Sequence, residues 1–336
     1  MPKRDIVVIG ASAGGIETCR QLLKLLPVDF KASVFVVIHL AASAPSVLPR
    51  ILARDSLLPV KNPQNGEVPV PGVVYVAPAN QHMILKPNFI QLGRGPRENG
   101  CRPSVNALFR TAAFSYGERV VGIIMSGALN DGTAGLMNIK GQGGVAIVQK
   151  PEEALFPGMP LSALEFVDVD YVLGISDIAG QLISIVDEPV NSLPALSQNS
   201  ESHVYEAGAA GLREGMEGTP SHFSCPSCGG VLWQSALEDF QEYKCHVGHA
   251  FTTEALLQEQ SDLIDTAFWR TLRQLEENIA LRRKLLKFAK SRHKEADALA
   301  LERQLQLAER QAETIRIALL SDVARLSDSD TASESN

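Results

Sequence analysis

Three polar residues, each placed directly after an apolar segment, have the side chains of a nucleophile, a base and an orienting acid. Ser12 lies in a Gly-Ala-Ser-Ala-Gly-Gly turn, His39 follows a second apolar segment, and Asp131 lies in an Asn-Asp-Gly turn after a later one. A serine hydroxyl attacks an acyl carbon only when a base removes its proton, which imidazole does near neutral pH. A carboxylate beside the imidazole fixes its tautomer and stabilises the imidazolium. The three residue types therefore predict hydrolysis of an ester or amide.

The segments that carry these residues predict a doubly wound α/β fold with a mostly parallel sheet. Unbroken aliphatic runs alternate with helical patterns over residues 1–188, and such runs are typical of strands buried on both faces. The carboxyl ends of parallel strands share one edge, where α/β proteins form their sites, so the three residues are expected to meet there. The predicted strands are Ile6–Ile9, Val34–Ile38, Val73–Val76, Val120–Met125, Val145–Val148 and Tyr171–Leu173, and helical patterns include Ile16–Leu26 and Val105–Ser115.

The glycine-rich turn around Ser12 is open to two other interpretations. Ser12 could serve only as a helix cap, a position that serine favours. The turn could also hold the pyrophosphate of a dinucleotide. That use requires glycine where Ser12 stands and an acidic residue after the second strand, where the chain has His39. Nucleotide binding is therefore disfavoured. The order Ser, His, Asp also differs from the order Ser, Asp, His of the α/β-hydrolases, which excludes that family.

Residues 5–187 resemble the catalytic domain of the CheB family, the chemotaxis protein-glutamate methylesterases. Seven motifs carry this resemblance in order, and together they are far more specific than any one alone. They are Val8–Gly15, Val36–Leu40, Gly72–Pro78 with His82 behind it, Arg102–Val105, Ser126–Gly132, Gln149–Glu152 and Gly158–Pro160.

The resemblance implies a cytoplasmic serine esterase that removes methyl groups from glutamyl methyl esters of chemoreceptors and also deamidates receptor glutamines. It assigns Ser12 as nucleophile, His39 as general base and acid, and Asp131 as the orienting carboxylate, with no cofactor for catalysis. The backbone N–H groups of Ala13 and Ala128 are expected to form the oxyanion hole.

Four further residues of this region could be taken for site residues. Arg102 either binds acidic groups of the substrate or is an ordinary surface arginine. His82 is expected to be a structural loop histidine, and Cys19 a small buried residue. Cys101 has no base near it in the sequence and is not predicted to be the nucleophile.

Three features depart from the family pattern. A Gly-Met-Gly stretch of the family is replaced by Gly127-Ala128-Leu129, which changes the lining of the oxyanion region. Asn106 stands where the family has an acid, so a charge is lost, and with it either a salt bridge or a helix N-terminal contact is expected to be lost. The sequence begins directly at the first strand, so the receiver domain that controls many members by phosphorylation is expected to be missing.

Four metal-ligating residues follow in a separate segment with the spacing C-x2-C-x16-C-x3-H. Cys225, Cys228, Cys245 and His249 predict a tetrahedral structural zinc site, and His249 is preferred to the adjacent His246 on grounds of reach. So short a segment cannot fold on apolar burial alone, which favours a metal. The alternatives are a redox-active Cys-x-x-Cys pair or a site that has lost its metal.

The remaining sequence predicts a linker and a helical region. Five parts are expected: a catalytic domain at 1–188, a linker at 189–221, a zinc-knuckle-like module at 222–253, a helical hairpin or coiled coil at 254–326, and a disordered tail at 327–336. Leucine and alanine repeat at coiled-coil spacing in the helical part, which predicts homodimerisation or a hairpin. A second function class follows, in which the module and the helices bind a signalling array and the esterase fold serves as a scaffold.

Composition excludes several function classes. The 336 residues carry 31 Lys and Arg against 38 Asp and Glu, a net charge of −7 that does not favour nucleic acid. No apolar run approaches the roughly 20 residues that cross a bilayer, so no membrane insertion is expected. Three of the five cysteines cluster within the proposed metal segment, which favours a reducing cytoplasm over a secreted disulfide framework.

Overall fold

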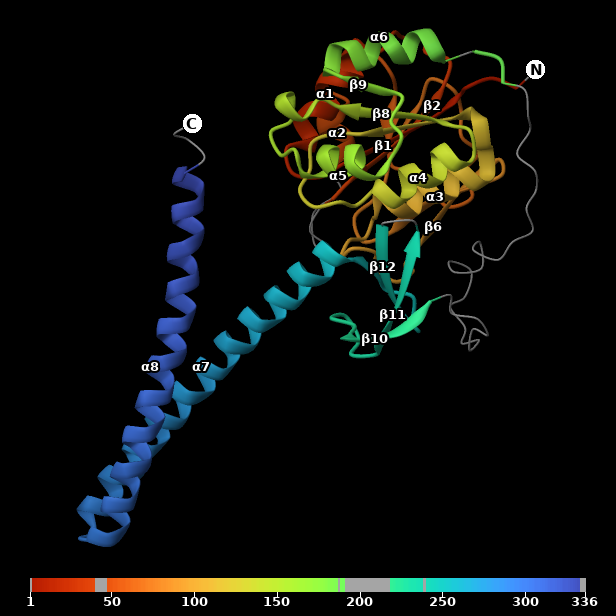
Figure 1. The fold of residues 1–336 in the computed structure, drawn as a ribbon. Coiled ribbons are helices and arrows are strands. Elements are labelled where there is room, and N and C mark those ends of the chain that lie inside the picture. The colour runs from red at the N-terminus through yellow and green to blue at the C-terminus, as the bar shows by residue number, and fades with distance from the viewer. Residues whose placement is uncertain (1, 40–46, 187, 191–217, 238–239, 333–336) are drawn as a thin grey trace. The chain divides into compact units, whose positions relative to one another are not determined.

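The computed structural model describes residues 2–39, 47–186, 188–190, 218–237 and 240–332. The chain divides into two compact units, Met1–Leu256 and Leu257–Asn336, which are described separately below (Figure 1). Most of the predicted linker, residues 191–217, lies outside the described residues.

A seven-stranded parallel sheet forms the centre of the first unit and confirms the predicted fold class (Figure 1). The strand order is β3-β4-β2-β1-β7-β8-β9. The chain passes from β1 to β2 on one side and returns later to β7 on the other side of β1, which makes the β1–β7 boundary a topological switch point. The strands are β1 (Ile6–Ala11), β2 (Ser33–Ile38), β3 (Val60–Lys61), β4 (Val74–Val76), β7 (Val120–Ile124), β8 (Val145–Gln149) and β9 (Tyr171–Leu173).

Alternating side chains of the central strands build a hydrophobic core on each face of the sheet. Val7 and Ile9 of β1 belong to one core, and Ile6 and Val8 belong to the other. The first core includes residues of α1 (Gly15–Leu25), α2 (Leu48–Leu52) and α6 (Ile175–Ile185). The second includes residues of α3 (Val105–Tyr116), α4 (Thr133–Gly141) and α5 (Gly158–Phe166). Two short 3₁₀ helices lie at Gly117–Arg119 and Pro151–Glu153.

Two short elements complete the catalytic region. One is an antiparallel hairpin of β5 (His82–Lys86) and β6 (Phe89–Gly93), and the other is β3 at the sheet edge. The sequence analysis did not predict β3, because a strand of two residues gives no measurable periodicity.

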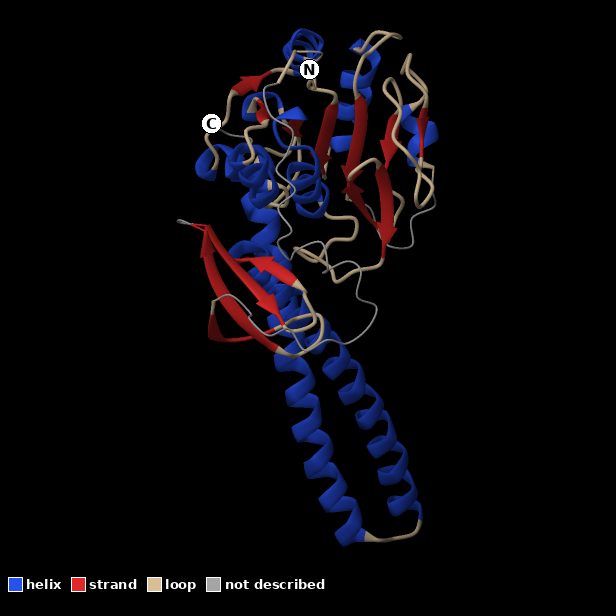
Figure 2. Cartoon of the chain, turned by 90° about the vertical axis from the view of Figure 1, so that its right-hand side faces the viewer, coloured by secondary structure: helices blue, strands red, loops and turns tan. Residues whose placement is uncertain are grey.

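The cysteine segment folds as a four-stranded antiparallel sheet in the order β10-β11-β12-β13 (Figure 2). The strands are β10 (Thr219–Ser224), β11 (Val231–Leu237), β12 (Phe240–Cys245) and β13 (Ala250–Thr252). The first strand begins at Thr219, within the predicted linker. Its side chains are mostly exposed, so no hydrophobic pattern marked it in the sequence.

The second unit is a helical hairpin. Helices α7 (Thr253–Ser291) and α8 (Glu295–Ala332) run side by side and are joined at Arg292–Lys294 (Figure 2). The buried side chains between them are Leu272, Ile279, Ala308, Ala312 and Leu319. The helix is assigned to Ala332, within the segment 327–336 predicted as a tail, and residues 333–336 lie outside the described residues. No helix within the described residues is long and apolar enough to cross a membrane.

Close packing of α3 against α4 generates a stability prediction. A Cβ added at Gly135 would lie 2.5 Å from Phe109 Cβ and 3.1 Å from Asn106 Cα, so Gly135→Ala forces two helices apart. Overpacking of this kind costs about 1–3 kcal/mol in the free energy of unfolding. Gly141→Ala, at a position with no neighbour within 4 Å, is the matched control and should be neutral or slightly stabilising. Hydrogen–deuterium exchange of β1 and β7 amides over a urea series measures both effects, and equal behaviour of the two variants would contradict the packing argument.

Candidate active site and metal site

Ser12, His39 and Asp131 lie together at the carboxyl edge of the sheet, beside the switch point. They follow β1, β2 and β7, the three adjacent central strands. Ser12 Oγ lies 3.2 Å from His39 Nδ1, and His39 Nε2 lies 2.7 Å from Asp131 Oδ2. The carboxylate accepts the Nε2 proton, which leaves the Nδ1 lone pair facing the serine hydroxyl. This arrangement can activate Ser12 as a nucleophile.

The Asp131 carboxylate is 2% exposed and is surrounded by hydrogen-bond donors. The backbone N–H groups of Val105 and Asn106 donate to it at 2.7 and 3.3 Å, at the N-terminus of α3. The Ser104 hydroxyl donates at 3.0 Å and the Asn99 amide at 3.3 Å. These donors, two of them at a helix N-terminus, hold the carboxylate in place beside the histidine.

The pKa of His39 is raised above the ordinary value of 6.5 for imidazole. Burial opposes protonation most strongly, but two neighbours outweigh it. The neighbouring Cys101 and Asp131 side chains both favour the protonated imidazole. The sequence analysis gave Cys101 no base, whereas the fold brings its side chain to the histidine. The neutral base form of His39 is therefore favoured only at higher pH than in a free imidazole.

The turn after β1 presents backbone donors near Ser12. Ser12 N donates to Ser126 O at 3.0 Å, and Ser126 Oγ donates to Ala13 O at 2.8 Å, which ties this turn to the end of β7. Among the described residues, the N–H groups of Ala13 and Ala128 have no hydrogen-bond acceptor, whereas Gly127 N donates to Phe156 O at 2.8 Å. Of the predicted oxyanion donors, these two therefore remain available to a substrate.

The stretch Gly127–Leu129 and the residue Asn106, where the sequence departs from the family pattern, have constrained surroundings. A Cβ on Gly127 would lie 2.9 Å from Ser12 Cβ and 2.1 Å from Met159 Sδ, so the turn requires glycine there. Leu129 adopts a φ of 60°, a left-handed conformation that a leucine side chain disfavours. Asn106 Oδ1 accepts from Gly132 N and Gly135 N, both at 2.9 Å. The expected loss of a helix N-terminal contact is therefore wrong, because the amide oxygen makes it for α4.

Arg102 lies in a basic loop region, where its side chain is held by neighbouring loops. Its guanidinium donates to Asn80 Oδ1 at 2.8 and 2.9 Å and to Gly95 O at 2.7 Å. Burial, with the charges of Arg97 and Arg94, lowers its pKa. Within the part of the chain that the structure describes, these contacts fix Arg102 without a carboxylate partner, and its role toward a substrate stays a prediction.

His82 and Cys19 have structural surroundings. The His82 ring is fully buried, accepts from Ser104 N at 3.3 Å and donates to Pro96 O at 2.9 Å, and burial lowers its pKa. It thereby supports the residue that donates to Asp131. Burial in the sheet core raises the pKa of the Cys19 thiol to about 12. The sequence analysis missed Asn99 and Ser104 as partners of Asp131, although Ser104 has a signal, because Pro-Ser before a helix indicates a cap.

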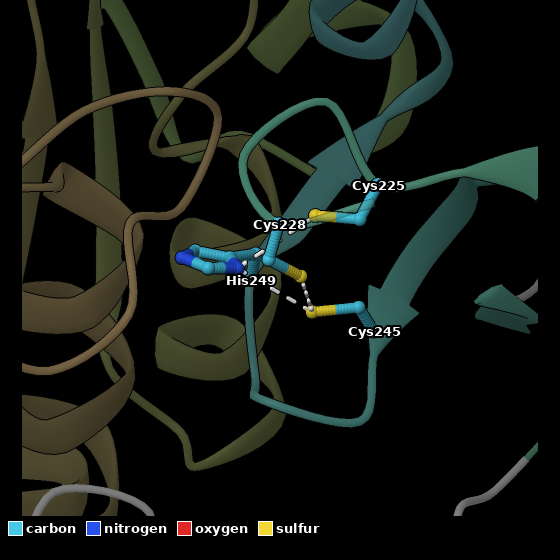
Figure 3. Close-up of side chains that lie close together, drawn as sticks. All are labelled: Cys225, Cys228, Cys245 and His249. Carbon is cyan, nitrogen blue, oxygen red and sulfur yellow. Dashed lines mark hydrogen bonds between the residues drawn. The ribbon is translucent and has the colours of Figure 1, made fainter. Parts of the chain in front are cut away.

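The four predicted metal ligands converge in the module that contains the four-stranded sheet β10–β13 (Figure 3). Their ligand atoms lie within 4.8 Å of one another. Cys228 Sγ lies 3.7 Å from Cys245 Sγ, and His249 Nδ1 lies 3.7 Å from Cys225 Sγ and 3.4 Å from Cys245 Sγ. A tetrahedral zinc ion requires about 3.8 Å between sulfur ligands and about 3.5 Å between sulfur and nitrogen. The donor set and its spacing therefore fit zinc, and His246 is exposed outside the group.

Comparisons with known proteins agree with this architecture. Residues 7–182 match the CheB methylesterase family. A Leptospira interrogans protein is 38% identical over 182 residues, which cover 54% of this chain and 94% of that protein. A Methanosarcina mazei protein named protein-glutamate methylesterase/protein-glutamine glutaminase 2 is 34% identical, covering 54% of this chain and 52% of its own.

A solved structure agrees as well. The CheB methylesterase catalytic domain of Thermotoga maritima is 34% identical, with a TM-score of 0.53, and the match covers 55% of this chain and all of that one. The matched family segment carries Ser12, His39 and Asp131, whereas residues 219–252 of the metal module lie beyond it. The chain belongs to the CheB methylesterase family.

Proposed function

We propose that the chain is a serine hydrolase that removes methyl groups from γ-glutamyl methyl esters of chemoreceptor-like proteins. The observation that carries the proposal is the continuous hydrogen-bonded series Ser12–His39–Asp131 at the switch point. The names of the relatives support the substrate class, since they pair glutamate methylesterase with glutamine glutaminase activity. Hydrolysis of a glutamine side chain is the same acyl chemistry with ammonia as the leaving group.

The proposed reaction proceeds in two steps. Ser12 Oγ attacks the ester carbonyl carbon while His39 Nδ1 takes the serine proton, and the carbonyl oxygen becomes an oxyanion that Ala13 N and Ala128 N stabilise. The C–O bond to methoxide then breaks, His39 returns the proton, and methanol leaves an acyl-serine. Water attacks this ester with His39 again as base, which releases the glutamate carboxylate and restores Ser12.

The basic loop region supports an acidic protein substrate. Arg94, Arg97 and Arg102 lie close enough for their charges to interact. An arginine cluster favours segments rich in carboxylates, such as a receptor surface that carries several glutamates. We propose Arg102 as the substrate contact of this cluster.

We further propose that Cys225, Cys228, Cys245 and His249 hold one structural zinc ion. Four protein ligands close the coordination sphere, so the ion would stabilise the module and take no part in ester hydrolysis. The support is the match between the ligand spacing and tetrahedral geometry. Elemental analysis of the purified chain tests the proposal directly.

A second role, as a docking or dimerisation element, is supported by α7 and α8. Large apolar side chains remain exposed on the hairpin, including Trp269 at 57% and Ile264 at 55%. Exposed apolar groups of this size are favoured at interfaces between proteins. We propose that a second copy of the chain covers them, with a signalling array as the alternative partner.

The nucleophile assignment predicts a large loss of activity in Ser12→Ala. Methanol release from glutamyl-methylated receptor membranes should fall by at least about 10⁴-fold, because a nucleophile and its base act as a unit. Cys101→Ala is the control, since Cys101 is the other nucleophilic side chain near His39. Loss of release in Cys101→Ala with retention in Ser12→Ala would overturn the assignment in favour of the thiol.

The raised pKa of His39 predicts the pH dependence. Attack needs neutral His39, so kcat/KM should rise with pH and its acidic limb should lie above the ordinary imidazole pKa of 6.5. Cys101→Ala removes one of the two raising interactions, so its limb should move to lower pH. The pH profile of kcat/KM for both proteins measures this, and superimposable limbs would show that Cys101 does not act on His39.

The dimer proposal predicts a change of mass in solution. The wild-type chain should sediment as a dimer, and the doubly substituted Ile264→Ser/Trp269→Ser chain should sediment as a monomer. Circular dichroism should show unchanged helix content in the variant. A wild-type chain that sediments as a monomer over the micromolar range would refute the proposal.

A further inference from the structure

The metal module is hydrogen-bonded to a loop of the catalytic domain beside Asp131. Strand β13 lies next to residues 97–99, where Asn99 N donates to Ala250 O at 2.8 Å and Ala250 N donates to Arg97 O at 3.3 Å. Ala250 directly follows the metal ligand His249. The position of this strand is therefore fixed at one end by the metal ligands and along its length by the catalytic domain.

The Asn99 side chain joins the module to the catalytic carboxylate. Thr252 N donates to Asn99 Oδ1 at 2.9 Å, and Asn99 Nδ2 donates to Asp131 Oδ1 at 3.3 Å. Asn99 is 7% exposed, so neither bond is open to water. Its φ of 50° lies in the left-handed region, which asparagine and glycine tolerate best. The buried Asn99 amide thus accepts a hydrogen bond from the module through its oxygen and donates one to Asp131 through its nitrogen.

A second pair of contacts holds the residue before Asp131. Thr252 Oγ1 donates to Asn130 Oδ1 at 2.7 Å, and Asn130 Nδ2 donates to Glu254 Oε2 at 2.6 Å. Asn130 and Thr252 are 4% and 2% exposed. The module therefore contacts both the carboxylate of Asp131, through Asn99, and the backbone neighbour that sets its position.

We propose that the metal-bound module positions Asp131, with Asn99, Asn130 and Thr252 as positioning residues, so that esterase activity requires the metal. The inference rests on the proposed esterase function and adds a regulation to it. The module core consists of few buried side chains, so without metal β13 is not held in place. Asn99 and Asn130 then lose their partners in the module, and the Asp131 carboxylate loses its fixed geometry toward His39.

The first test removes the metal and follows catalysis and structure together. His249→Ala should lose zinc and lower kcat by about 10–100-fold, since misplacement by about 1 Å can cost that much. His246→Ala, an exposed neighbour outside the ligand group, should retain both zinc and kcat. Chelation of the wild type should reproduce the loss, readdition of zinc should reverse it, and amide exchange in residues 97–101 should be faster only without metal.

The second test removes the bridge and leaves the metal. Asn99→Gly keeps the left-handed backbone and the bond to Ala250 O but deletes the amide. It should retain one zinc per chain and lower kcat by about 10-fold, with KM changed by less than about two-fold, because Asn99 is buried at 7% exposure and offers a substrate little surface. If Asn99 had only a structural role, the substitution would lower the content of folded protein, and the folded fraction would keep the kcat of the wild type.

The outcomes separate the two proposals. Zinc-free wild type with the full kcat, or Asn99→Gly with the full kcat, would overturn the positioning role and leave the esterase proposal intact. A zinc-loaded, folded wild type that releases no methanol and does not label at Ser12 with a fluorophosphonate would refute the esterase function, and the inference with it.

Discussion

A buried carboxylate needs hydrogen-bond donors that replace its lost hydration, and Asp131 is such a group. Its donors come from different parts of the first unit: the N-terminus of α3, the Ser104 hydroxyl, the Asn99 amide and the His39 ring. The close approach of α4 to α3 at Gly135 and the support of Ser104 by His82 serve this arrangement. The catalytic geometry is therefore a property of the fold around one carboxylate.

The same requirement gives the metal module a place in the site. Its buried core is small, whereas a structural zinc ion contributes about 10–16 kcal/mol in comparable small modules. On the proposal that the site holds zinc, metal coordination therefore contributes more to the position of β13 than side-chain packing does. Thr252 of this strand contacts Asn99 and Asn130, and these two contacts are the route by which the proposed metal binding would be coupled to the placement of Asp131.

The fold and the central residues could be predicted from sequence because their signals are local. Aliphatic runs identified the long strands, and Ser12, His39 and Asp131 follow three of those runs. The cysteine spacing predicted the ligand group in the same way. Partners brought together by tertiary structure left no such signal. Asn99 and Cys101 stand in a polar loop, and their proximity to Asp131 and His39 depends on how that loop is folded and held.

One loop consequently acts on both members of the His39–Asp131 pair. Residues 97–101 carry Asn99, which donates to the carboxylate, and Cys101, which raises the pKa of the imidazole. Two backbone hydrogen bonds between Glu98 and Cys101 place Asn99 and Cys101 in one tight turn. A higher pKa makes His39 a stronger base but reduces the neutral fraction present near pH 7. Ala250 of the module is hydrogen-bonded to Arg97 and Asn99 of this loop, so the positioning role proposed for the module extends to the turn that carries Cys101.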